Sequence, residues 1–253
     1  MYSKYELLYL IKILDYYEQG LVRIIEYYIN TYTFICNLKD NNIKFVNTVV
    51  LWCRNSTNKK CLNKYGHISN WNVSNITSMK NEFNGKSNFN DDISRWNTSN
   101  VTNMNAMFQN AKEFNQPIGN WEVSNVIEMQ FMFLNAVSFN QPLNNWDVSN
   151  VSNMNYMFYG AKFFNQSLCS WNVSNVTNMN EMFYDTYNFN QSLCSWDFSN
   201  ISKINGMCIY IKKINGKLNR SKWGQYLIDC PNMYKLFESI YNYHIKNNII
   251  INY

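Results

Sequence analysis

Apolar positions between residues 71 and 218 follow a pattern that repeats every 25 residues, and Trp begins each copy. The six copies start at Trp71, Trp96, Trp121, Trp146, Trp171 and Trp196. A fixed period of this length is typical of a solenoid, in which each repeat leaves an apolar face that only its neighbour covers. We therefore expect these six tryptophans to form one continuous stack in the core.

The spacing within one repeat predicts two kinds of backbone. From Val101 to Phe108 the apolar residues recur mainly at three-residue intervals, which favours one face of a short helix, and the Ser-Asn pair before them offers N-caps. Trp121 and Val123 are two residues apart, so both point to the same side of an extended segment. The sequence predicts an α/β repeat fold: a leucine-rich-repeat-like solenoid with a parallel β ladder, short helices and helical caps at both ends.

Asn and Met also recur at fixed positions of the repeat. The Asn that follows Phe in each repeat is expected to form a turn and to satisfy backbone groups of the loop. Its copies are Asn90, Asn115, Asn140, Asn165 and Asn190. The methionines have helical spacing and apolar neighbours, so we interpret them as core residues and not as metal ligands.

The repeat resembles a known family. The phrase Trp-x-Val-Ser-Asn-Val-Thr-x-Met-x-x-Met-Phe, followed by Phe-Asn-Gln-Pro-Leu, runs through 96–118 and 121–143 with small variations. It is similar to the repeats of the BspA-like leucine-rich-repeat surface proteins. That resemblance implies recognition of other proteins at cell surfaces, with no shared catalytic residues. The richness in Asn, Lys, Ile and Tyr is consistent with a member from a protist or a large DNA virus.

Four regions follow from these patterns. We expect a helical hairpin at 1–42, a cap and lead-in segment at 43–70, the six repeats at 71–218 and a helical cap at 219–253. The hairpin is most simply a packing element. An alternative is an F-box-like adaptor helix pair, because the apolar spacing from Glu6 to Leu14 is similar to the opening of that family.

The start of the chain lacks the basic residues, unbroken apolar stretch and cleavage site of a secretory signal, and no apolar run of about 20 residues could span a membrane. The sequence thus predicts an intracellular location, or the cytoplasm of a virus-infected host.

Net charge argues against nucleic acid as a partner. The formal charge is +5, but residues 71–215 carry 8 Lys and Arg against 10 Asp and Glu, so the positive excess lies in the end regions. A nucleic-acid groove needs columns of basic residues beside exposed aromatic rings, whereas the aromatic residues here belong to the core pattern.

No motif in the sequence has the residue types and spacing of a catalytic, metal or cofactor site. The 7 cysteines include no Cys-x-x-Cys pair, and the 2 histidines, His67 and His244, are expected in opposite caps. Asp91 and Asp92 are neighbours in a loop and should point apart. We therefore predict no enzyme activity.

Two cysteines could still form a disulfide. Cys169 and Cys194 occupy the same place in successive repeats, so their Cα atoms should lie about 5 Å apart. Neighbouring parallel segments rarely provide the dihedral angle that a disulfide requires. Free thiols in a reducing compartment are the simpler expectation.

One outward position between Trp and Val forms a polar, slightly acidic row, here called the strip. Its members are Asn72, Asn97, Glu122, Asp147, Asn172 and Asp197. We predict that the protein is a non-catalytic scaffold that binds another protein through the strip. A solvated face with no partner, or a structural role in a particle or surface layer, are the alternatives.

Overall fold

The computed structural model describes residues 45–54, 62, 65–193, 195–204 and 206–207; for 42–44, 211–214 and 217–220 it describes the backbone only. The hairpin expected at 1–42, apart from its last residue, lies outside these described residues. So does the helical cap expected at 219–253, except for residues 219 and 220.

Regular elements lie only at the two ends of the described chain. Helix α3 spans Asn42–Arg54, and the short 3-10 helix η1 spans Ile68–Asn70. Strands β1, Ile211–Ile214, and β2, Lys217–Arg220, follow the repeats and pair with each other in antiparallel fashion.

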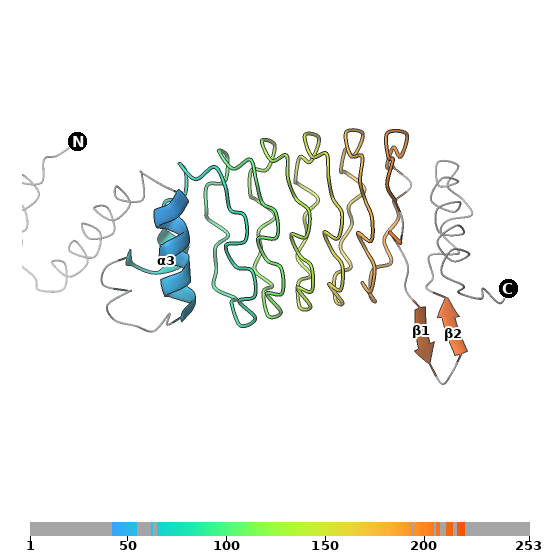
Figure 1. Ribbon diagram of the computed structural model, residues 1–253, viewed down its shortest axis with the longest axis horizontal. Coiled ribbons are helices and arrows are strands. Elements are labelled where there is room, and N and C mark those ends of the chain that lie inside the picture. Colours follow the sequence, from blue (N-terminus) through green and yellow to red (C-terminus); the bar gives the residue numbers. More distant parts are fainter. Residues whose placement is uncertain are drawn as a thin grey trace, which may run out of the picture.

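Between these elements, each repeat forms one coil, and successive coils lie side by side along one axis (Figure 1). We number the coils 1 to 6, starting each at its Trp. Isolated parallel bridges join each coil to the next. The bridged residues are Ser78, Asn103, Glu128, Asn153, Asn178 and Lys203.

These bridges lie seven residues after each Trp, whereas the sequence predicted the parallel ladder beside Trp and Val. Turns within the coil explain the difference. The Trp96 N–H donates to the carbonyl of Ile93 (3.1 Å), and the Val101 N–H donates to that of Thr98 (2.8 Å). Donors that close turns in their own coil are not free to pair with a neighbouring coil.

Residues 103–110 and their equivalents, here called the ladder segment, carry most of the contacts between coils. In coil 2 the N–H groups of four alternate residues donate to carbonyls of coil 3 at 2.7–2.9 Å. The donors are Met104, Ala106, Phe108 and Asn110. The intervening Met107 and Gln109 donate three residues back within coil 2 (both 3.2 Å). The backbone N–H groups of each ladder segment therefore form hydrogen bonds both within their own coil and to the next coil.

The short helix predicted for this segment is wrong in the described repeats, where turns take its place. Ala106 and Asn110 have φ of 52° and 59°, and a right-handed helix cannot contain two left-handed residues. Three-residue apolar spacing does not distinguish a helix from consecutive tight turns. The first left-handed column is Asn81, Ala106, Phe131, Tyr156, Glu181 and Gly206, and the second is Gly85, Asn110, Asn135, Gly160 and Asp185.

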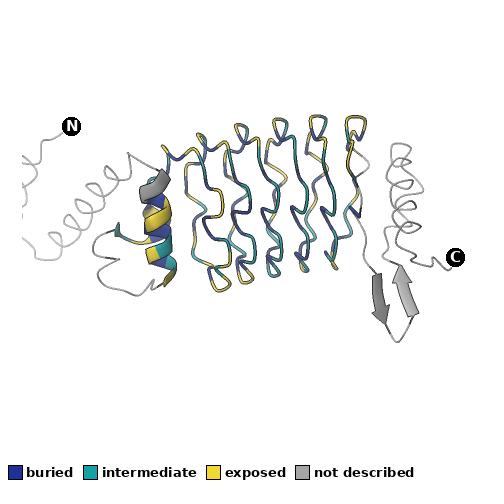
Figure 2. Cartoon of the chain, viewed as in Figure 1, coloured by how far each residue is buried: buried dark blue, intermediate teal, exposed yellow. Residues whose placement is uncertain are grey.

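The core is built from columns of like side chains, and Figure 2 shows buried positions recurring on successive coils. The six tryptophans are 1–3% exposed. Trp96 and Trp121 stack at 6.3 Å between ring centroids, and Trp171 stacks on Trp196 at the same distance. Phenylalanines form parallel columns beside them, such as Phe108 on Phe133 at 5.6 Å.

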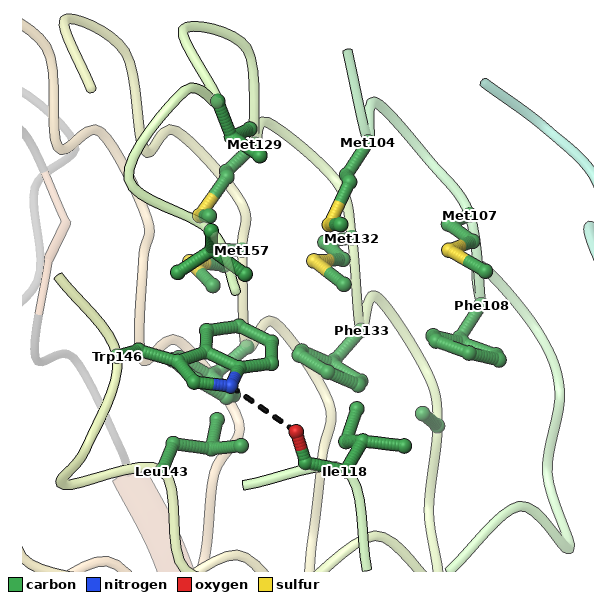
Figure 3. Packing of buried hydrophobic residues seen from close by; sticks show 14 of the residues in the cluster. Met104, Met107, Phe108, Ile118, Met129, Met132, Phe133, Leu143, Trp146 and Met157 are labelled. Atoms are coloured by element: carbon green, nitrogen blue, oxygen red, sulfur yellow. Dashed lines mark hydrogen bonds between the residues drawn. The ribbon is translucent and has the colours of Figure 1, made fainter. Parts of the chain in front are cut away.

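Each buried indole also ties two coils together. The Trp146 Nε1–H, at the start of coil 4, donates to the carbonyl of Ile118, near the end of coil 2, at 3.1 Å (Figure 3). The same bond recurs at Trp96, Trp121, Trp171 and Trp196. Because a buried donor without a partner is costly, this bond explains why the position is Trp and not another large apolar residue.

Asparagine side chains add two further ties between coils. The Asn100 amide donates to the carbonyl of Ser74, one coil earlier, at 2.7 Å, which accounts for the Asn of the repeated Ser-Asn pair. The Asn90 side-chain oxygen accepts the Asn115 backbone N–H (2.9 Å) and the Gln116 amide (3.0 Å). The prediction that this second Asn satisfies loop backbone groups is confirmed for Asn90, Asn115, Asn140 and Asn165, whereas the Asn190 side-chain oxygen has no partner in the described structure.

Helix α3 covers the N-terminal end of the coils, as expected from the apolar spacing between residues 45 and 53 (Figure 1). Phe45 packs edge-on against Trp96 at 5.6 Å between ring centroids, and Trp52 does so against Trp71 at 5.8 Å. The Trp52 indole also donates to Asp91 at 2.8 Å. The helix therefore seals the apolar columns that coil 1 would otherwise expose.

The sixth repeat does not continue as a coil to residue 218 as predicted. Residues 211–214 and 217–220 instead pair as an antiparallel hairpin, with Ile211 opposite Arg220. The sequence contains the reason: the two residues between the strands are Asn-Gly, the pair that best forms a tight hairpin turn.

One polar residue interrupts the methionine columns. Coils 2 to 6 have Met107, Met132, Met157, Met182 and Met207 at this position, all fully buried. Coil 1 has Glu82, which is 4% exposed, and neither of its carboxylate oxygens has a hydrogen-bond partner. Burial raises the pKa of Glu82 from 4.5 to about 8.

We expect Glu82 to make the protein less stable as the pH rises from about 5 to about 8. Its pKa is higher in the folded chain, so between 4.5 and about 8 the folded state binds a proton that the unfolded state has lost. Glu82→Met should remove this dependence and raise the free energy of unfolding at high pH by on the order of a few kcal/mol. Denaturant unfolding across this range would measure both, with the exposed Glu113→Met as control. Parallel pH curves for the Glu82→Met variant and the parent would refute the prediction.

Trp146→Ala should lower the free energy of unfolding by about 3–5 kcal/mol, because it leaves a cavity in the core and frees the buried Ile118 carbonyl. Trp146→Phe keeps most of the apolar contact but loses the donor, so its cost should be smaller. Chemical unfolding of both variants gives the comparison. A loss below about 1 kcal/mol for Trp146→Ala would contradict the tryptophan column as a main source of stability.

Candidate functional site

The strip predicted from sequence has a local structural role at every position. Each side-chain oxygen accepts the backbone N–H of the Ser two residues later, at 2.9–3.1 Å. The six acceptors are Asn72, Asn97, Glu122, Asp147, Asn172 and Asp197. Five of them are exposed and Asn72 is half-buried.

These bonds explain the residue types in the strip. Asn and Asp close the turn that begins each coil, as they do in Asx turns generally. Hydrogen bonds from the Ser149 hydroxyl and backbone hold the pKa of Asp147 below its usual value. The strip is therefore a surface row in which one side-chain oxygen of each residue is already engaged in a turn.

A second surface lies on the ladder segments, where the positions 7, 9, 10 and 13 residues after each Trp lie outside the apolar core columns. We call it the ladder face. Its central coils bring together four aromatic side chains, here called the aromatic patch. They are Phe131, Tyr156, Tyr159 and Tyr184, all half-buried.

The rings of the aromatic patch are in contact with one another. Phe131 stacks on Tyr156 at 5.2 Å between centroids, and Tyr159 stacks on Tyr184 at 5.1 Å. Tyr156 and Tyr159 join the two pairs at 5.7 Å. Four large rings thus form one continuous aromatic surface across coils 3 to 5.

Carboxylates accompany this patch. Glu128, Glu181 and Asp185 are on the ladder segments of coils 3 and 5, and the Tyr156 hydroxyl donates to Glu181 at 3.1 Å. Residues 128–135, 153–160 and 178–185 contain no Lys or Arg. The ladder segments that carry the patch are therefore acidic, and Glu181 is the carboxylate that contacts one of its rings.

Two amide oxygens next to the rings lack partners in the described structure. They are Gln130 Oε1 and Asn155 Oδ1, which are buried although the residues themselves are half-buried. Each precedes a ring of the patch by one residue. An unsatisfied buried acceptor costs about 1–3 kcal/mol, so these two amides are high-energy features of the free protein.

The backbone beneath the patch is strained. Phe131, Tyr156 and Glu181 have φ of 61°, 58° and 52°, a conformation that bulky residues rarely adopt. The same column has Asn81 and Gly206 at its ends, which adopt it easily. Strain of this kind concentrates at functional sites, where a specific side chain is retained despite its conformational cost.

Sequence reasoning missed this surface, although one signal was present. The first left-handed column varies from Asn to Ala, Phe, Tyr, Glu and Gly, while the core position on either side is Met in five of the six coils. Variation inside an otherwise strict repeat marks positions that packing does not determine.

Asp91 and His67, the residues that most resemble parts of a catalytic site, lie where α3 packs against the first coil. Asp91 accepts from Trp52 and lies 3.9 Å from His67 Nε2, too far for a hydrogen bond. His67 Nδ1 faces the Ser69 hydroxyl at 2.7 Å and accepts the Ser69 N–H at the start of η1. Asp92 accepts from the Ser94 N–H, so Asp91 and Asp92 have different partners, as expected.

The described cysteines are free. Cys53 is half-buried and Cys169 is exposed, while Cys194 lies outside the described residues. Burial is the main cause that raises the pKa of the Cys53 thiol to about 11, so it stays protonated at neutral pH.

Two kinds of site were sought in the described part of the chain. It contains no group of three or more His, Cys, Asp and Glu side chains that could hold a metal ion. It also contains no helix of the length and apolarity needed to cross a bilayer.

Comparison with known proteins identifies one family. The family model described as "Mycoplasma protein of unknown function, DUF285" matches residues 53–167, 117–223 and 141–248. The three matches overlap and together cover all six repeats. Neither a curated protein nor a solved structure matches the chain.

Proposed function

Because the chain belongs to the DUF285 repeat family, we propose that it is a non-catalytic scaffold that binds another protein through the aromatic patch. The stacked coils, the parallel bridges and the capping helix support a leucine-rich-repeat-like solenoid, related to the BspA-like surface proteins.

The observation that carries this proposal is the strained backbone under the patch. Phe131 and Tyr156 occupy a column in which Asn or Gly would adopt the backbone more easily, so aromatic side chains retained there support a role beyond folding. Half-exposed aromatic rings are the side chains that contribute most to protein interfaces.

The strip is the weaker candidate for the binding surface. Its oxygen atoms already accept turn hydrogen bonds, and its Asn, Asp and Glu side chains offer no apolar area. Exposed polar side chains of this kind contribute little to affinity compared with aromatic anchors.

Affinity capture from the native source, followed by quantitative mass spectrometry, tests the proposal. In the patch variant, each ring is replaced by a residue found at the same repeat position in another coil. Phe131→Asn and Tyr156→Asn follow Asn81, and Tyr159→Gln and Tyr184→Gln follow Gln109. The Asn replacements also relieve the strained φ. The amount of partner captured by this variant should be about tenfold or more below the amount captured by the parent protein.

The matched control changes the strip to the Asn of its own column: Glu122→Asn, Asp147→Asn and Asp197→Asn. It should capture the partner as the parent does, and thermal unfolding should show that both variants are folded. Loss of the partner with the strip variant but not with the patch variant would overturn the proposal.

A further inference from the structure

We propose that the segment of the partner that binds the aromatic patch is positively charged and contains arginine. This inference rests on the proposed function, and it names the chemistry of the partner.

Charge is the first argument. Glu128, Glu181 and Asp185 lie on the ladder segments that carry the patch, and the ladder segments of coils 3 to 5 have no basic residue to offset them. Carboxylates beside low-dielectric aromatic surface favour a cationic partner and disfavour phosphate groups. An acidic peptide or a nucleic acid would therefore be disfavoured over coils 3 to 5, whereas Lys80 and Lys203 occupy the same face on coils 1 and 6.

The combination of rings and carboxylates favours arginine over lysine. A guanidinium group is planar, stacks on aromatic rings and donates two parallel hydrogen bonds to a carboxylate. Glu181 already accepts from the Tyr156 hydroxyl through Oε1, which holds the carboxylate beside the ring. A guanidinium there could contact an aromatic ring and a carboxylate at once.

The molecule shows the same kind of contact at another place. The Lys162 ammonium lies 5.2 Å from the centroid of the Tyr187 ring, and that ring is 41% exposed. A cation over an exposed tyrosine is thus already a stable arrangement on coils 4 and 5.

The amide oxygens of Gln130 and Asn155 fit the same partner. Both are acceptors without a donor in the described structure. Because these oxygens are shielded in the free protein, rotation of the terminal amide would have to present them to a donor. Arginine supplies five N–H donors and no acceptor, so it could satisfy them without adding an unpaired group.

The test uses short fluorescent peptides in which glycine alternates with arginine, lysine or glutamate, and it measures binding to the full chain by anisotropy. The arginine peptide should bind most tightly and the glutamate peptide should not bind. Raising NaCl from about 50 mM to about 500 mM should weaken binding, because charges contribute to it.

Two variants that remove the same charge make the test specific. The charge variant is Glu128→Asn, Glu181→Asn and Asp185→Asn, each replaced by the Asn found in its own column. The strip variant, Glu122→Asn, Asp147→Asn and Asp197→Asn, removes three carboxylates elsewhere. The charge variant should bind the arginine peptide at least about tenfold more weakly than the parent protein does. The strip variant should bind it less than about twofold more weakly. Glu128→Gln alone, away from the strained positions, should give a smaller loss.

Equal losses for the two variants would show attraction by net charge only and would overturn the inference. Equal binding of the glutamate peptide, or tighter binding of a fluorescent oligonucleotide, would also overturn it. If the native partner requires the four rings but is unaffected by the charge variant, the inference fails and the proposed function stands.

Discussion

The structure depends on one arrangement of backbone hydrogen bonds. In each ladder segment alternate N–H groups point to the next coil, and the groups between them close turns within their own coil. A column of backbone bonds requires every coil to have the same length, which is why no insertion interrupts the repeat. Indole, Asn and Gln side chains then strengthen the same contacts, so each coil is stable mainly through its neighbours.

Much of the core could be predicted from sequence, because burial imposes a period that the residues display directly. The Trp, Phe and Met columns are cases where one position in every repeat meets the same environment. The backbone between them was harder to predict. Consecutive turns and a helix share their three-residue apolar spacing, and Ala106, Phe131 and Tyr156 give no sign of a left-handed backbone.

The sequence pointed to the strip and not to the aromatic patch for a related reason. Exposure and polarity drew attention to positions such as Asp147, but those properties also describe a turn that caps its own backbone. The sequence analysis assigned aromatic residues to the core pattern as a group, whereas Phe131 and Tyr156 are half-buried and lie outside the core cluster. What distinguishes Phe131 and Tyr156 is that bulky aromatic residues adopt a left-handed backbone there. The backbone conformation cannot be read from the sequence alone.

The one-way orientation of the ladder gives the stack two electrically different ends. The alternate N–H groups of the ladder segments that reach another coil all point toward the following coil, so their peptide dipoles add along the axis, and N–H groups such as those of Thr102 and Ile127 offset part of the sum. Ladder carbonyls such as those of Asn103 and Asn105 accept from the preceding coil, so the end covered by α3 is the negative pole. Growth or docking at that pole favours a donor or a cation, and the opposite pole favours an acceptor.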